Sequence, residues 1–322
     1  MLSRSAEGLY WLGRYLERAQ HLSRLLRIQT EALVDRPVTE IHFGWLRLYG
    51  CLNRQPPVGS LELLAQDDYS LADSYTLADD LTFEPTNPDS VWSGVAAARE
   101  NARHVRHCLS AEMWTCLNRS YLRIQGLTIQ DIWASSPERF YAETVAEIDT
   151  FAGVTAATMY RDEGWRFLNL GRSIERVQLS SALLDAQIAA ANVTQDVSEA
   201  AWTSLLRLYH ALEAYDRTFS LQVEPRQVLD LLATDARLPD SLSRSLDMLS
   251  AELAATAPSP SQQAAGAAQR LIGRMSALVN FAWLDRDDPR SLLQRLNAHG
   301  RELHDLVTET YFQYPVHDAP VR

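Results

Sequence analysis

The stretch LGRYLERAQHLSRLL, residues 12–26, returns as LGRSIERVQLSSALL at residues 170–184. Nine of the fifteen aligned positions are identical, and both copies keep an adjacent Glu-Arg pair, Glu17-Arg18 and Glu175-Arg176. Apolar residues three and four positions apart in each copy predict an amphipathic helix. The chain therefore carries one helical pattern twice, 158 residues apart, and the rest of the sequence is interpreted from this repeat.

Two further pairs of segments follow the same order along the chain. WLRLYGCL (45–52) resembles LLRLYHAL (205–212) at an offset of 160 residues, and NPDSV (87–91) resembles LPDSL (238–242) at an offset of 151 residues. Three collinear matches at nearly one offset indicate an internal duplication.

The remaining sequence is also helical in pattern. Segments rich in Ala, Leu, Arg, Glu and Gln favour helix, strand signals are scarce, and Pro or Ser/Asp caps precede most periodic runs. We therefore predict an all-α fold in which residues 1–322 form a single helical-bundle domain. Its two internally duplicated halves, about 1–155 and 156–322, are expected to pack about a pseudo-two-fold axis.

Composition narrows the class of protein. The chain has 322 residues, 46% of them hydrophobic, which is enough for a substantial core. Its formal net charge of −11 opposes nucleic-acid binding through bulk electrostatics. Every basic residue is arginine, so a Walker A lysine and a Schiff-base lysine are both excluded. Any bound anion must then be held by arginines, backbone N–H groups or helix N-termini.

The sequence also bears on cellular location. No window approaches about 18 consecutive apolar residues, and the first residues turn amphipathic at once, so we expect a cytoplasmic protein with no membrane association. Three cysteines, an odd number in a long chain, favour reduced thiols over a disulfide framework.

The repeated helix divides into three lines of residues on a helical wheel. Leu12 and Leu16 belong to the apolar line, Glu17 follows Gly13 on a second line, and Arg14 with Arg18 is expected opposite the core. Three interpretations stay open. The Glu-Arg pairs form a partly buried ionic lock between the halves, or they flank a polar ligand-binding cavity at the pseudo-axis, or they form an ordinary solvated face.

A second concentration of polar residues lies between positions 98 and 119. Arg99, Arg103 and Arg106 have the spacing of one helix face, which suggests either an intrahelical salt-bridge face or an anionic partner. His104 and Cys108 could share a face, but a zinc site would need two more ligands from elsewhere. We therefore expect no metal site, and no cofactor-binding motif is recognisable.

Three segments carry a resemblance to a known family: the N-terminal LSRSAEGLYWLGRYLERAQHLSRLL, the central NPDSVWSGVAAARENARHVRHCLSAEMWTCLNRSYL and the later GWRFLNLGRSIERVQLSSALLDAQI. Together they resemble the alpha-E family, a bacterial all-helical family named for its Glu-Arg motif. The resemblance covers nearly the whole chain. It implies two partners, a circularly permuted ATP-grasp ligase and a transglutaminase-like peptidase, and a small peptide or amino-acid substrate.

Two functions follow from that resemblance. One is an accessory component that docks on the ATP-grasp ligase or presents its substrate in a system that forms amide or peptide bonds. The other is a transferase that binds a peptide or acyl phosphate in an Arg/Glu pocket. The candidate catalytic residues are Glu17, Glu112 and Glu175. The candidate ligand-binding residues are Arg4, Arg14, Arg18, Arg99, Asn101, Arg103, Arg106, Trp114, Asn118, Arg172 and Arg176.

Overall fold

The computed structural model describes residues 1–57, 70–194, 199–219, 222–256, 262–284 and 288–312, and within these ranges it contains helices and no strand. This confirms the predicted all-α class. The elements are α1 (Ser3–Asp35), α2 (Val38–Leu52), α4 (Ser70–Thr82), α5 (Val91–His104), the short 3-10 helix η1 (Arg106–Cys108), α6 (Ala111–Ile124), α7 (Ile129–Trp133), α8 (Pro137–Thr158), α9 (Glu163–Thr194), α10 (Glu199–Leu208), α11 (Leu212–Thr218), α12 (Pro225–Thr234), α13 (Leu242–Ala255), α14 (Gln262–Ala277), the π-helical turn η2 (Leu278–Ala282) and α15 (Pro289–Tyr311).

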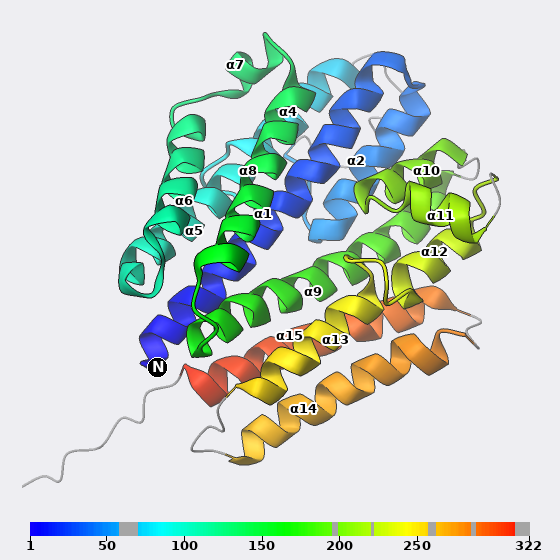
Figure 1. Cartoon of the computed structure of the whole chain (residues 1–322). Coiled ribbons are helices and arrows are strands. Elements are labelled where there is room, and N and C mark those ends of the chain that lie inside the picture. Colours follow the sequence, from blue (N-terminus) through cyan, green and yellow to red (C-terminus); the bar gives the residue numbers. More distant parts are fainter. Residues whose placement is uncertain (58–69, 195–198, 220–221, 257–261, 285–287, 313–322) are drawn as a thin grey trace, which may run out of the picture.

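Two long helices, α1 and α9, contain the repeated segments and make the most extensive helix–helix interface of the molecule. Helices α5 and α8 pack on α1, whereas α13 and α15 pack on α9. Figure 1 shows α13, α14 and α15 on one side of the α1–α9 pair and α5, α6 and α8 on the other. Helix α2 crosses over to pack on α9, and α10 contacts α1. The core is thus continuous around the two long helices.

Local sequence explains where several helices begin and end. Helix α1 ends at Asp35 because Arg36 takes an extended conformation ahead of Pro37. Ser90 caps α5 by accepting a hydrogen bond from the backbone N–H of Ser93, and Ser241 caps α13 in the same way. Both caps come from the Pro-Asp-Ser motifs that the sequence repeats.

Two glycines permit the close approach of α1 and α9. A Cβ added at Gly13 would overlap the carbonyl oxygen of Leu168, and one added at Gly171 would overlap the carbonyl oxygen of Tyr10. Each glycine therefore lies directly against the backbone of the opposite helix, where any larger residue would force the helices apart. None of the described helices combines the length and apolar character needed to cross a membrane.

This packing predicts the effect of Gly171→Ala. The added methyl group has to displace the backbone of α1, so the free energy of unfolding should fall by about 1–3 kcal/mol. Gly153→Ala is the matched control, because Gly153 lies in α8 with no atom within 4 Å of its would-be Cβ. The control should be neutral or stabilise the protein by about 0.5–1 kcal/mol. Chemical denaturation measures both, and equal stability of the two variants would contradict the close approach.

Candidate functional site

The Glu-Arg pairs meet where α1 crosses α9. Glu17 is 6% exposed, and its carboxylate accepts from Arg176 at 2.5 Å (Nε to Oε1) and 2.9 Å (Nη2 to Oε2). Arg172 approaches the same carboxylate with its Nε 3.5 Å from Oε2. The glutamate of the first repeated segment is therefore held by arginines of the second.

The second glutamate, Glu175 of α9, is bound by arginines of α1. Glu175 is 2% exposed, and it accepts from the Nε of Arg14 at 2.5 Å and from the Nε of Arg18 at 2.7 Å. Arg14 also donates to the side-chain oxygen of Gln178 at 2.8 Å. Both carboxylates thus use both of their oxygens in bonds to guanidinium groups of the opposite helix. We call these residues the crossing cluster: Arg14, Glu17, Arg18, Arg172, Glu175 and Arg176.

Two aspartates extend the crossing cluster outward. Arg18 donates to Asp89 at 2.9 Å, and the Nη1 of Arg176 lies 2.9 Å from Asp240. Asp240 also accepts from Arg24 at 2.8 Å. Both aspartates stand one residue before the cap of the next helix, in NPDSV and LPDSL. In the sequence these motifs indicate repetition. The Asp that both copies keep is also the one sequence feature from which these ion pairs could have been predicted.

The opposite charges of the crossing cluster stabilise the ionised forms of its glutamates and arginines. Burial by itself raises the pKa of Glu17 and of Glu175, but the neighbouring arginines outweigh it and hold the pKa of both carboxyls below the ordinary value. The pKa of Arg18 and of Arg176 is raised, because attraction to the glutamates exceeds the cost of burial. Both glutamates are therefore ionised at neutral pH and fully paired.

The sequence interpretation placed Arg14 opposite the core, and that placement is wrong. Arg14 is 5% exposed, and its guanidinium lies over the ring of Trp11, 5.0 Å from the ring centroid. Helix α1 has no continuous solvent face, because α5, α8 and α9 surround it. A helical wheel predicts that a line of charged residues faces water. This prediction holds only for a helix that has one side open to solvent.

The arginines predicted between residues 99 and 106 do not share one helix face. Helix α5 ends at His104, and Arg106 lies in the following 3-10 turn, so the expected line of three is interrupted. Arg99 donates to Asn118 at 3.0 Å, and its guanidinium stacks over Tyr121 with 4.4 Å to the ring centroid. Arg103 instead pairs with Glu100 in an exposed i, i+3 contact.

The other candidates lie apart from the crossing cluster. Trp114 stands beneath both Arg99 and Arg106 between α5 and α6, with guanidinium-to-ring distances of 5.7 and 5.6 Å. Asn101 donates to the carbonyl oxygen of Ala97 in its own helix. Glu112 and Arg4 are exposed. The structure therefore brings together Glu17 and Glu175 but not Glu112.

A pocket of about 420 Å³ opens beside one side of the crossing cluster. Arg18 and Glu175 lie on its wall, whereas Glu17 is not among its lining residues. Polar side chains of α9 and α15 complete the wall: Gln178, Asp185, Gln294, Asn297 and Arg301. Of the two repeated glutamates, Glu175 therefore lies on the wall of this pocket and Glu17 does not.

The described residues contain no cluster of three or more His, Cys, Asp or Glu side chains placed to hold a metal ion. Cys51, Cys108 and Cys116 are all unpaired thiols, as predicted. Burial raises the pKa of the Cys51 thiol to about 12, which removes its nucleophilic form at neutral pH.

The ion pairs predict a large loss of stability in Glu175→Ala. The substitution leaves Arg14 buried without its counter-charge and Arg18 with Asp89 alone, which should lower the free energy of unfolding by about 3–5 kcal/mol. The control is Glu100→Ala, which breaks the exposed pair with Arg103 and should leave stability nearly unchanged. Thermal and urea unfolding report both values. A small loss in Glu175→Ala would contradict the dependence of the buried Arg14 on this carboxylate.

Comparison with known proteins identifies relatives of the chain and its family. The chain is 25% identical over 339 aligned residues to an uncharacterised protein of Mycobacterium bovis and to uncharacterised proteins of Mycobacterium tuberculosis. The alignment covers 97% of this chain and 37% of each relative, so the chain spans little more than a third of the length of these proteins. No solved structure matches the chain. The family model described as "a predicted alpha-helical domain with a conserved ER motif" matches residues 1–312, so the chain belongs to the Alpha-E family.

Proposed function

We propose that this chain is an accessory helical component of an ATP-grasp-dependent system that forms amide or peptide bonds, and that it docks on the ligase or presents its substrate. The observation that carries the proposal is the engagement of Glu17 and Glu175. Each carboxylate is buried and bound on both oxygens by arginines. Neither is free to take a proton from an attacking amine, whereas a scaffold needs no free carboxylate.

We further propose that the scaffold arose by internal duplication into halves of about 1–155 and 156–322. The reciprocal binding of Glu17 and Glu175 supports this. So does the correspondence of neighbours, since α5 and α8 pack on α1 as α13 and α15 pack on α9. In a duplicated scaffold each half covers the apolar face of the other.

The length of the relatives supports a role beside other domains. The aligned segment is 37% of each mycobacterial relative, so those proteins carry the helical domain within a longer chain. Under the proposal, a circularly permuted ATP-grasp ligase and a transglutaminase-like peptidase act with this chain in the cytoplasm, on a small peptide or amino-acid substrate. No catalytic metal or cofactor is assigned to the chain itself.

The proposal predicts that this chain changes the output of the ligase. A circularly permuted ATP-grasp ligase from the same genome is incubated with ATP and an amino-acid pool, with and without the chain. ATP turnover and products are followed by phosphate release and mass spectrometry. We expect a stable complex and a new or more abundant amide product when the chain is present. Identical turnover and products in both reactions, without a complex, would refute the accessory role.

A second function is favoured by one observation, the pocket of about 420 Å³ that Arg18 and Glu175 help to line. In a transferase, the arginine would bind the carboxylate or phosphate of an acyl donor there. Ala182 lies on the wall of this pocket. The aligned position of the first segment carries Arg24, which binds Asp240. The small side chain at position 182 thus leaves this side of the crossing cluster open.

Ala182→Arg separates the two functions, because it fills the pocket while Glu17, Glu175 and their arginine partners stay unsubstituted. Ala251→Arg is the matched control, at an exposed position of α13. If the pocket binds substrate, Ala182→Arg loses amide product while the complex with the ligase persists, and Ala251→Arg keeps both. Under the accessory proposal, both variants retain product formation. Mass spectrometry of the products, with size-exclusion chromatography of the complex, measures the difference.

A further inference from the structure

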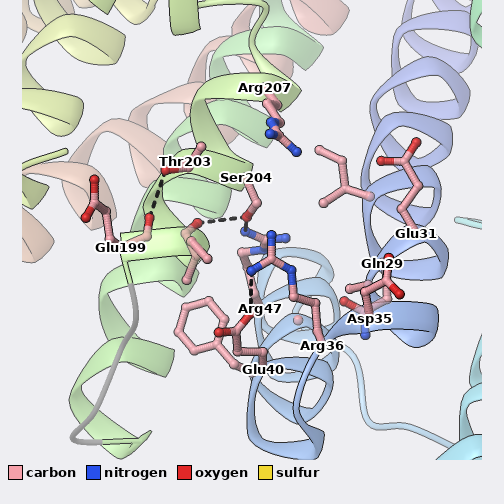
Figure 2. Close-up of a pocket in the computed structure, with 16 residues that line it drawn as sticks. Gln29, Glu31, Asp35, Arg36, Glu40, Arg47, Glu199, Thr203, Ser204 and Arg207 are labelled. Carbon is pink, nitrogen blue, oxygen red and sulfur yellow. Dashed lines mark hydrogen bonds and ion pairs between the residues drawn. The ribbon is translucent and has the colours of Figure 1, made fainter. Parts of the chain in front are cut away.

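A second pocket, of about 580 Å³, lies away from the crossing cluster, between the C-terminal part of α1, helix α2 and helix α10 (Figure 2). Its volume falls within the range of small-molecule sites in proteins. Two of its lining residues, Arg47 and Arg207, occupy matched positions of the repeated Leu-Arg-Leu-Tyr segment.

Arg47 is the unusual member of this pocket. It is 2% exposed, and its Nη1 donates to the side-chain oxygen of Gln187 and to the hydroxyl of Ser204, each at 3.1 Å. Its Nε has no hydrogen-bond partner. A guanidinium has five N–H donors, so the uncharged partners in the described part of the chain leave much of its capacity unused.

The contrast with the crossing cluster shows what Arg47 lacks. Arg14 is buried to a similar extent, but it binds the carboxylate of Glu175 directly. No carboxylate of the described residues forms an ion pair with Arg47, and burial lowers its pKa to about 10. The group still carries its charge at neutral pH. A buried charge without a counter-charge is costly, and a bound anion would remove that cost.

The surroundings define which anion fits. Arg36 and Arg207 also line the pocket, and both are labelled in Figure 2. Acidic residues line it as well, with Glu31 and Asp35 on the α1 side. A multiply charged phosphate would be repelled by these carboxylates. A ligand with one carboxylate for Arg47 and an ammonium group for the acidic side would satisfy both.

We propose that the pocket at Arg47 is a binding site for the carboxylate of a free amino acid or short peptide, with Asp35 on the acidic side receiving its ammonium group. The site rests on the contacts of Arg47 and is independent of any catalytic role at the crossing. Its use to present a substrate to a ligase rests on the proposed function above. Binding by the isolated chain therefore tests the site, and failure of the ligase experiment would leave that result standing.

The test measures binding to the isolated full chain by calorimetry and by thermal shift. The probes are the standard amino acids and the dipeptide Ala-Ala, then the C-terminal amide and N-acetyl form of any that bind, and inorganic phosphate. We expect binding of at least one free-carboxylate probe. Its C-terminal amide should bind about 10- to 100-fold more weakly, because a charge-assisted hydrogen bond is lost. Its N-acetyl form should also be weaker.

Variants locate the site. Arg47→Met keeps much of the side-chain volume and removes the charge, so it should abolish binding without lowering the melting temperature of the unliganded chain. Arg207→Ala and Asp35→Asn test the rim if Arg47→Met fails to fold, and each should weaken binding. Arg217→Ala is the matched control, at an exposed arginine outside the pocket, and should bind as the wild type does.

Three results would overturn the proposal. The first is the absence of binding by every carboxylate probe. The second is full affinity in Arg47→Met or, if that variant is unfolded, in both Arg207→Ala and Asp35→Asn. The third is binding of inorganic phosphate in preference to all amino-acid and peptide probes, which would assign the pocket to a different class of anion.

Discussion

The rest of the structure depends on the reciprocal ion pairs between α1 and α9. Glu17 binds arginines of α9, and Glu175 binds arginines of α1, at a crossing close enough for glycine to meet backbone. The next most extensive contacts among the described helices, those of α5, α2, α15, α8 and α13, are each made with α1 or α9. If they separated, three buried charged groups, Arg14, Glu17 and Glu175, would lose ion-pair partners at once, which favours this crossing geometry over a shifted one.

Buried ion pairs contribute more to the choice of one arrangement than to overall stability. Removing a carboxylate and two guanidinium groups from water costs several kcal/mol per ion, and good geometry recovers about that amount. A shifted register of α1 on α9 would leave the charges buried and unpaired, whereas an apolar interface would tolerate several registers. The aspartates at the starts of α5 and α13 extend the same constraint, because Asp89 and Asp240 tie the next helices to the arginines of the crossing.

Arg47 stands outside this pattern, and the difference is informative. The arginines of the crossing cluster have carboxylate partners inside the protein, so the chain needs no ligand to neutralise them. Arg47 has amide and hydroxyl partners and an unsatisfied Nε beside an open pocket. In one fold, then, arginine has two uses. At the crossing it forms ion pairs within the protein, and at position 47 it is a buried charge that a ligand carboxylate can neutralise.

The sequence by itself determined the helical class, the starts of α5 and α13 at their serine caps, and the importance of the repeated Glu-Arg pairs. These features are local, because periodicity and capping depend on residues within a few positions of each other. The division into two duplicated halves remains our interpretation of the repeats. Only the tertiary structure decided which arginine holds which glutamate, that Arg14 is buried, and that Arg47 lacks an acid among the described residues. The reason is that these outcomes depend on how helices more than 100 residues apart cross, and helical periodicity carries no information about the partner across a crossing.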